Sequence, residues 1–326
     1  MNERVDVRRI AAVGVASCLG GNHAECNLGS AVLHDSLLVK RICAMSGLRM
    51  EWRASIHPGL DGVDSTVGAV CRCVTALAQE LVAENQPFVF FSGDHSSAMG
   101  IWKGVTKALL PQQRCGLIWI DAHMDAHTFS TSPSGNLHGM PLAALLGQGD
   151  EVLTDLYGEG PVLRPQDVVL LGVRSYEPAE QRLLQRLGVR YFEMPKLVDS
   201  EMLKNSLQQA IALIAADTDC YGISIDLDAI DPSDAPAVGT PEPGGLSGRA
   251  LCEALAELNS DSRLIGLEIA EFSPLYDKGN RTERLIGEMV CALYGELEVA
   301  NSNLLAPVGS ENAAIKARGT PFGRSK

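Results

Sequence analysis

The segment DAHMDAH, residues 121–127, carries an acidic or imidazole side chain at every second position. On an extended backbone alternate side chains point to the same face, so these four groups are expected to project together. They are Asp121, His123, Asp125 and His127. Packing alone gives little reason to place four such groups at the end of an apolar segment. The chemistry that they could support is metal binding.

The segment SIDLDAIDP repeats this pattern, with Asp226 and Asp228 on one face of an apolar run. Ionised carboxylates are costly to bury without a partner. Turn chemistry explains Asp231, which precedes Pro232. Helix capping or pairing with arginine is the structural alternative for the interior carboxylates. Two divalent cations explain them better. Asp226 and Asp228 supply two negative charges, Asp121 and Asp125 supply two more, and two such ions would neutralise all four.

Two histidines complete the expected metal site, since His95 and His123 add one imidazole for each ion. Oxygen ligands with some imidazole and no thiolate favour manganese or a similar ion over structural zinc. Two such ions can share a water molecule, lower its pKa and supply hydroxide at neutral pH. The reaction class that we predict is hydrolysis.

Short apolar segments that alternate with amphipathic ones must position these groups. We predict strands at 9–16, 87–93, 116–123, 167–174, 189–194, 221–230 and 263–272, and helices at 69–84, 97–110, 139–146, 178–187, 201–216, 248–258 and 284–297. This alternation is typical of an α/β fold with a predominantly parallel sheet covered by helices on both faces. We therefore predict a single three-layer domain over residues 1–306, followed by a C-terminal tail at 307–326.

The candidate residues follow four of the predicted strands. His95 comes after the strand at 87–93, and Glu271 ends the strand at 263–272. In open parallel sheets, ligands bind beyond the carboxyl ends of the strands. We therefore expect the acids and imidazoles to meet at one edge of the sheet.

Composition narrows the class of protein. The chain has 326 residues, 46% of them hydrophobic, and a formal net charge of −13, which argues against nucleic acid or an anionic membrane surface as a partner. We expect no transmembrane span and no secretory signal. Nine singly scattered cysteines predict a reduced, cytoplasmic chain. Cys18, His23 and Cys26 lack zinc-type spacing and are interpreted as buried thiols and a surface imidazole.

Six segments in order resemble successive motifs of the ureohydrolase family, which contains arginase and agmatinase. They are SGDHS (92–96), DAHMDAH (121–127), SGNLHG (134–139), SIDLDAIDP (224–232), GTPEPGGL (239–246) and EIAEFSP (268–274). The resemblance implies an arginase-like fold, a guanidino substrate and an oligomer, commonly a trimer or hexamer. It also implies that a metal-bridging hydroxide attacks the guanidinium carbon and releases urea and an amine.

The resemblance further implies two Mn²⁺ ions per subunit. The ligands of one ion would be His95, Asp121, Asp125 and Asp226; those of the other would be Asp121, His123, Asp226 and Asp228, so that Asp121 and Asp226 bridge. Glu271 matches the carboxylate that receives the guanidinium, a role that suits bidentate pairing. His138 matches the active-site histidine, a candidate proton shuttle to the leaving amine. Asp94, beside a ligand histidine, is a candidate for supporting it.

The segment HTFSTSPSGNLHG, residues 127–139, resembles the arginase branch, in which a polar loop binds the α-carboxylate of the substrate. The matching residues are Ser132, Ser134 and Asn136. A Ser/Gly-rich surface loop without function is the alternative interpretation of these three. Agmatinases, whose substrate lacks that carboxylate, do not resemble this loop. The expected reaction is therefore hydrolysis of L-arginine to L-ornithine and urea.

Two positions depart from the arginase pattern. His127 stands where arginases usually have Asn, and SYEPAE replaces the usual D-V-D-P-x-E. Ser175 and Glu177 thus stand where aspartates are usual. The aspartate that Glu177 replaces normally meets the substrate α-amino group. Glu180 matches the downstream acid of the pattern. These departures leave open a different guanidino substrate: agmatine, guanidinobutyrate, or a longer or modified arginine analogue.

Three other classes of protein share parts of this pattern. A dimetal phosphoesterase would use similar ligands, but no Gly-rich phosphate cradle or basic cluster adjoins the motifs. Zinc deacetylases share a related fold but need one metal, so the presence of both His95 and Asp228 counts against them. A non-catalytic relative would usually lack a metal ligand, and all six are present.

Overall fold

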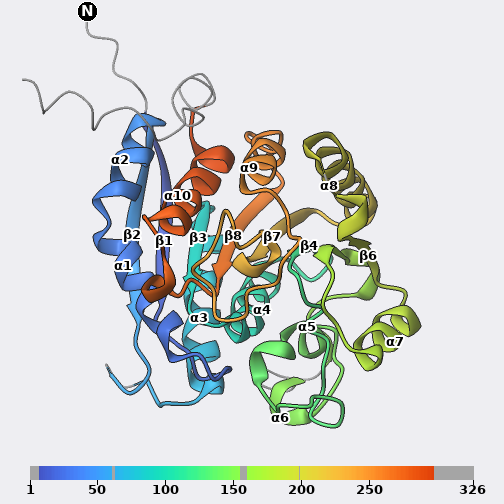
Figure 1. Ribbon diagram of the computed structural model, residues 1–326. Coiled ribbons are helices and arrows are strands. Elements are labelled where there is room, and N and C mark those ends of the chain that lie inside the picture. Colours follow the sequence, from blue (N-terminus) through green and yellow to red (C-terminus); the bar gives the residue numbers. More distant parts are fainter. Residues whose placement is uncertain (1–6, 61–62, 155–159, 198, 297–326) are drawn as a thin grey trace, which may run out of the picture.

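The computed structural model describes residues 7–60, 63–154, 160–197 and 199–296. Residue 297, where the last predicted helix ends, and the predicted tail at 307–326 lie outside this part. One sheet of eight parallel strands runs through the molecule in the order β2-β1-β3-β8-β7-β4-β5-β6 (Figure 1). The strands are β1 Arg8–Val15, β2 Leu48–Ile56, β3 Phe88–Ser92, β4 Cys115–Ile120, β5 Val168–Val173, β6 Arg190–Glu193, β7 Cys220–Asp226 and β8 Leu264–Ala270.

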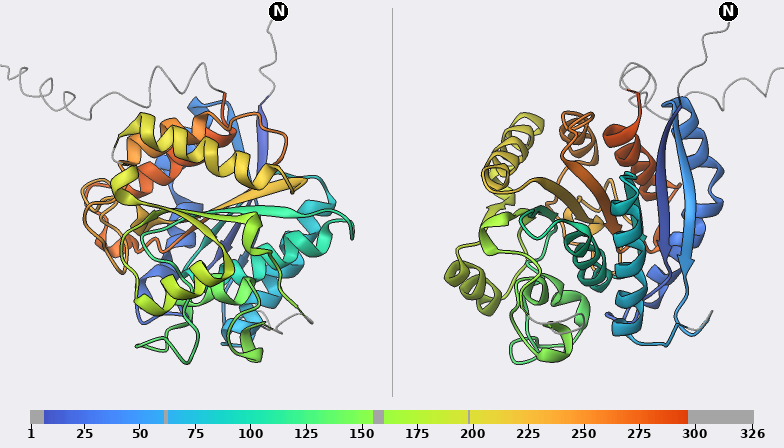
Figure 2. Two further views of the ribbon diagram at one scale, coloured as in Figure 1. Left: turned by 90° about the vertical axis from the view of Figure 1, so that its right-hand side faces the viewer. Right: turned by 180° about the vertical axis from the view of Figure 1, so that it is seen from behind.

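Helices cover both faces of this sheet, which lies between two helical layers (Figure 2). One layer contains α1 Gly29–Asp35, α2 Leu37–Met45, α8 Ser200–Ala215, α9 Gly248–Ala256 and α10 Arg281–Tyr294. The other contains α3 Val67–Ala83, α4 Ala98–Ala108, α5 Pro141–Leu145 and α7 Pro178–Leu187, and a short helix, α6, spans Glu151–Thr154. The predicted three-layer α/β architecture is confirmed.

The central strands owe their continuous apolar sequences to burial on both faces. In β3, Val89 and Phe91 enter the core under one helical layer, while Phe88 and Phe90 enter the other. Full burial of each such side chain stabilises the fold by about 1.5–3 kcal/mol. This two-sided packing makes the central strands a rigid platform for the loops at their carboxyl ends.

The strand prediction was incomplete at the edge of the sheet. It lacked β2, whose sequence LRMEWRASI mixes polar and apolar residues because an edge strand is only partly covered. Helices α1, α2 and α6 were also not predicted. The strand predicted at 116–123 was too long, because β4 ends at Ile120.

Within the described residues, no helix combines the length and apolarity needed to cross a membrane. All nine cysteines lie in this part of the chain, and all are free thiols.

Candidate metal centre and active site

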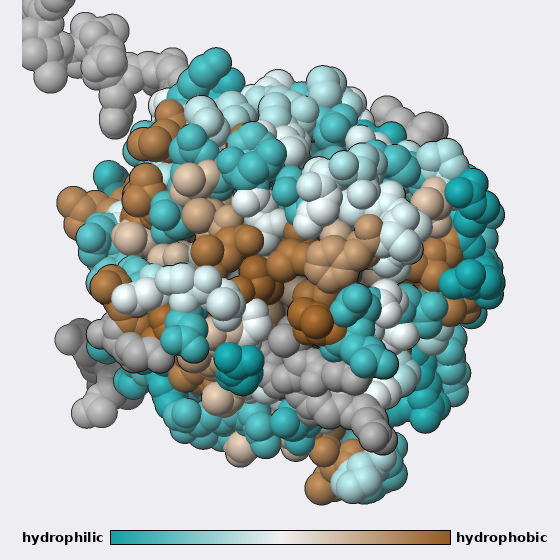
Figure 3. Space-filling view, turned by 90° about the horizontal axis from the view of Figure 1, so that it is seen from below, coloured by the Kyte–Doolittle hydropathy of each residue, from teal (hydrophilic) through white to brown (hydrophobic). Residues whose placement is uncertain are grey.

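Four neighbouring strands bring the predicted site residues together. They lie in the order β3-β8-β7-β4, so the residues that follow their carboxyl ends share one edge of the sheet. The strands point downward in Figure 1, and Figure 3 looks onto this edge. There, hydrophobic residues gather near the centre of the face and hydrophilic ones dominate its periphery (Figure 3).

The first cluster of ligand atoms surrounds His95, the first residue of the turn after β3. Its Nδ1 atom lies 3.3 Å from Asp121 Oδ2, 3.2 Å from Asp125 Oδ2 and 3.3 Å from Asp226 Oδ2. All four side chains are buried. Three acids from two strand ends therefore converge on one imidazole nitrogen.

The second cluster shares Asp121 with the first. His123 Nδ1 lies 3.0 Å from Asp228 Oδ2 and 3.6 Å from Asp121 Oδ1. The backbone N–H of Asp228 donates to Asp226 Oδ1 at 2.9 Å, which joins the aspartate that ends β7 to the one in the turn that follows. The structure thus groups all six predicted metal ligands.

This arrangement fits divalent cations. His95 Nδ1 and Asp125 Oδ2 are buried without a hydrogen-bond partner among the described residues. Burial, reinforced by the charge of Asp121, raises the pKa of Asp125 to about 7. Burial and the neighbouring aspartates also raise the pKa of Asp226. Cations bound between these atoms would remove the cost of keeping the carboxylates ionised.

Two site residues have left-handed backbone conformations that are uncommon outside glycine, with φ of 47° at Asp125 and 69° at Glu271. The Asp125 carbonyl accepts from Leu142 N at 3.0 Å, and Glu271 N donates to Gly93 O at 2.7 Å. Such strain persists only where surrounding contacts hold it. The left-handed conformation of Asp125 turns the chain out of the strand direction. The alternation of side chains expected over residues 121–127 therefore does not continue along an extended backbone.

His138 and Glu271 form a second pair beside the metal ligands. His138 Nδ1 lies 3.1 Å from Glu271 Oε1, and the same oxygen accepts from the backbone N–H of His95 at 3.0 Å. Burial lowers the pKa of His138, but the hydrogen bond and charge of Glu271 outweigh it and raise the pKa to about 9. Asp94 accepts from Gly20 N, whose carbonyl in turn accepts from His138 N.

A cavity of about 120 Å³ lies among these groups. Its lining residues are His123, Asp125, His127, His138, Gly139, Glu177, Glu180, Asp226, Asp228 and Thr240. Acids and imidazoles dominate this wall, and it contains no lysine or arginine. Such a cavity suits a small cationic group.

His127 pairs with two glutamates on the wall of this cavity. Its Nε2 lies 2.9 Å from Glu177 Oε2 and 3.3 Å from Glu180 Oε2. Glu177 and Glu180 form a capping box at the start of α7, and Glu180 also accepts from Ala126 N. Residues 127, 177 and 180 are therefore fixed to one another.

The three polar loop residues are placed differently. Ser132, Ser134 and Asn136 are not among the residues that line the cavity. Ser132 Oγ accepts from Gly135 N, and Asn136 Nδ2 donates to Asn22 Oδ1 at 2.9 Å. The structure does not bring these residues to the cavity wall.

Several contacts of the predicted ligands were not predicted. His95 Nε2 lies 2.9 Å from Ser224 Oγ, which donates to the buried Glu268 at 2.7 Å. Thr240 Oγ1 donates to Asp228 Oδ2 at 3.1 Å, and His123 Nε2 lies 3.7 Å from Glu242 Oε1. The motif GTPEPGGL, residues 239–246, contains Thr240 and Glu242, but the spacing of its residues did not assign a role to either of them.

The sequence model of the Arginase family matches residues 10–295. The chain belongs to the arginase family. This confirms the ureohydrolase resemblance, and the chain is an arginase-type hydrolase.

Individual members of the arginase family agree over nearly their full lengths. The chain is 39% identical to an arginase from Bacillus caldovelox and 34% identical to one from Brevibacillus brevis, over 89% of this chain and 99% and 98% of the relatives. The crystal structure of arginase from Bacillus cereus superposes with a TM-score of 0.79 at 32% identity, covering 89% of this chain and 99% of that one.

Proposed function

We propose that this member of the arginase family hydrolyses L-arginine to L-ornithine and urea at a centre of two Mn²⁺ ions. The convergence of two imidazoles and four aspartates beside a small acidic cavity carries this proposal. The relatives named arginase, at up to 39% identity, support the choice of substrate.

The proposed ligands divide into two sets with two shared members. His95, Asp121, Asp125 and Asp226 would hold one ion, and Asp121, His123, Asp226 and Asp228 the other. The oxygen-rich donor set with imidazole favours Mn²⁺. When bound, such ions lower the pKa of water enough to supply a nucleophile at neutral pH.

In this proposal, Glu271 orients His138 and accepts N–H groups of the substrate guanidinium. A carboxylate suits planar N–H donors because two oxygens can accept in parallel. His138, held at 3.1 Å by Glu271, would give its proton to the leaving amine. The hydrogen bond to Glu271 and the charge of that carboxylate raise the pKa of His138 and so favour the protonated ring that this transfer needs.

The His138→Ala variant tests the proton transfer. We expect kcat to fall by about 100-fold or more, because general acid catalysis contributes about 10²–10⁴-fold. Two Mn²⁺ ions should remain bound, which metal analysis of the purified variant measures. His34→Ala on the exposed surface of α1 is the matched control and should keep full activity. Metal loss from His138→Ala would contradict the proton-transfer role.

Substrate selection is proposed to lie on the wall formed by His127, Glu177 and Glu180. Two carboxylates held by one imidazole can accept the α-ammonium of an amino acid. We propose that Ser132, Ser134 and Asn136 meet the α-carboxylate.

Agmatine, which lacks the α-carboxylate, is a second candidate substrate. The residues that line the cavity include no lysine or arginine to pair with a carboxylate, and Ser132, Ser134 and Asn136 are not among them.

A panel of guanidino compounds separates the two candidates. We expect a higher kcat/KM for urea release from L-arginine than from agmatine or guanidinobutyrate, measured with Mn²⁺-loaded protein. Faster release from either of the other compounds would overturn the assignment to arginine.

The His127→Asn variant, run on the same panel, tests whether this wall sets the preference. Because His127 anchors Glu177, its loss should change the ratio of kcat/KM values between arginine and agmatine. An unchanged ratio would remove His127 from the selection of substrate.

A further inference from the structure

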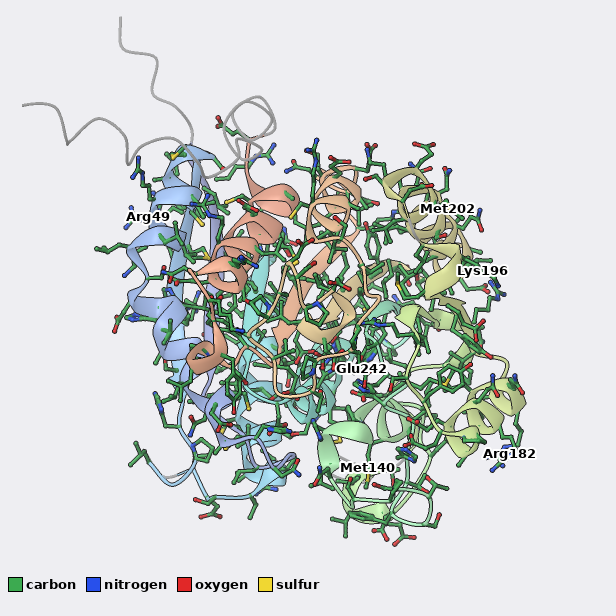
Figure 4. The ribbon with its side chains drawn as sticks, viewed as in Figure 1. Arg49, Met140, Arg182, Lys196, Met202 and Glu242 are labelled. Atoms are coloured by element: carbon green, nitrogen blue, oxygen red, sulfur yellow. The ribbon has the colours of Figure 1, made fainter. Side chains whose placement is uncertain are left out.

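The outer nitrogen of His123 faces a carboxylate for which the proposed reaction has no use. Nδ1 of this histidine points to Asp121 and Asp228, and Nε2 lies 3.7 Å from Glu242 Oε1. Both side chains are about one-third exposed, at 28% and 33%, so this pair lies at the rim of the site. Figure 4 labels Glu242 near the middle of the view, whereas Arg49, Arg182 and Lys196 lie toward the periphery.

Three contacts hold Glu242 in this position. Ser175 Oγ donates to Oε1, the same oxygen that faces His123, at 3.1 Å. Arg174 Nη2 donates to the backbone carbonyl of Glu242 at 2.6 Å. The same nitrogen of Arg174 donates to the carbonyl of Asp228, also at 2.6 Å, which fastens the loop of Glu242 to the turn that carries a metal ligand. The carboxylate therefore has a defined place relative to the centre.

We infer that Glu242 is a positioning residue for His123 and, through it, for the second metal ion. A histidine binds a metal through an unprotonated nitrogen, and an acceptor at the other nitrogen selects that tautomer and fixes the ring. The negative charge of Glu242, 3.7 Å from Nε2, favours the tautomer with its proton on Nε2 and leaves the Nδ1 lone pair directed at Asp121 and Asp228. This inference rests on the metal centre proposed above.

His95 shows the same arrangement on the other side of the centre. Its Nδ1 faces the aspartates, and its Nε2 faces Ser224 Oγ, whose proton goes to Glu268. Ser224 is fully buried, so His95 is held from within the core. His123 is held instead by a rim loop, which makes the second ion the one that depends on residues 239–246.

Titration of the metal-stripped full-length chain with Mn²⁺ alone tests this inference, with free Mn²⁺ followed by electron paramagnetic resonance. In Glu242→Ala, we expect the affinity for one of the two ions to fall about 10- to 100-fold, the usual effect of removing the partner of a ligand histidine. Glu242→Gln should lose less affinity than Glu242→Ala, because its amide oxygen can still face Nε2 although the charge is lost. Glu201→Ala, on the exposed surface of α8, is the control and should bind as the wild type does.

A second-site change tests the role of the carboxylate directly. Ser175 contacts the oxygen that faces His123, so Ser175→Asp can supply a carboxylate from the opposite side. In the Glu242→Ala background, this change should recover most of the lost affinity. Recovery would also exclude a general collapse of the loop as the cause of the loss.

Unchanged affinity for both ions in Glu242→Ala would overturn the inference. A raised KM in the same variant would then make Glu242 a substrate contact. Because the titration uses no substrate, its outcome stays independent of whether arginine proves to be the compound hydrolysed.

Discussion

Replacing Asp226 by alanine should abolish urea release. Asp226 is 4% exposed, its Oδ2 lies 3.3 Å from His95 Nδ1, and its Oδ1 accepts from Asp228 N. Like Asp121, it touches both ligand clusters, so its loss should weaken both ions. We expect kcat/KM to fall by far more than the roughly 10- to 100-fold typical of residues that only support a ligand.

Two further variants separate the metal role of Asp226 from its role in packing. Asp226→Asn keeps the shape of the side chain but removes its charge, so it should also be inactive and should bind fewer than two ions. Asp219→Asn, which precedes the other end of the same strand, should keep normal activity. Activity of Asp226→Ala within tenfold of the wild type, with two ions bound, would remove Asp226 from the centre.

Removing the metal ions should inactivate the enzyme and also lower its thermal stability. Four buried aspartates meet within the two clusters, and without cations their negative charges repel one another. Ions that bind only the folded state stabilise it by about 4 kcal/mol per site at 1,000 times Kd. For two sites, we expect chelation to lower Tm by roughly 10 °C or more.

Differential scanning calorimetry and urea assays on the same samples measure both effects. Adding Mn²⁺ back should restore Tm and activity together. Asp226→Ala is the matched control, because its Tm should respond much less to chelator or to Mn²⁺. Full activity in chelated protein that analysis shows to be metal-free would contradict the proposed chemistry.

Local pattern was sufficient to predict the central strands and one edge strand, β6, but not the other edge strand, β2. The strands β3, β4, β7 and β8 are covered on both faces, and their sequences are therefore continuously apolar. Strand β2 has a neighbouring strand on one side only, and its polar residues hide it from such a pattern. The end of β4 at Ile120 was also missed, since the turn at Asp125 depends on contacts with residues 142 and 143.

The placement of the loops could not be predicted, because it depends on contacts between distant segments. His127 and Glu177 are fifty residues apart, and nothing in either segment shows that they pair. That Ser132 and Asn136 meet the substrate stays a prediction; the contacts that hold them, within their own loop and with Asn22, are not apparent from the sequence. The contact between His123 and Glu242 likewise appears only when β4 and β7 lie side by side.

The sequence by itself predicted the reaction class and a set of six metal ligands, which the structure brings close together. Buried carboxylates and imidazoles at the ends of apolar segments have few stable explanations other than cations, so residue type and position were informative. Tertiary structure decided which groups surround that centre: the wall of His127 and Glu177, the pairing of His138 with Glu271, and the support of His123 by Glu242. These contacts depend on how loops from different strands pack against one another, which no local pattern records.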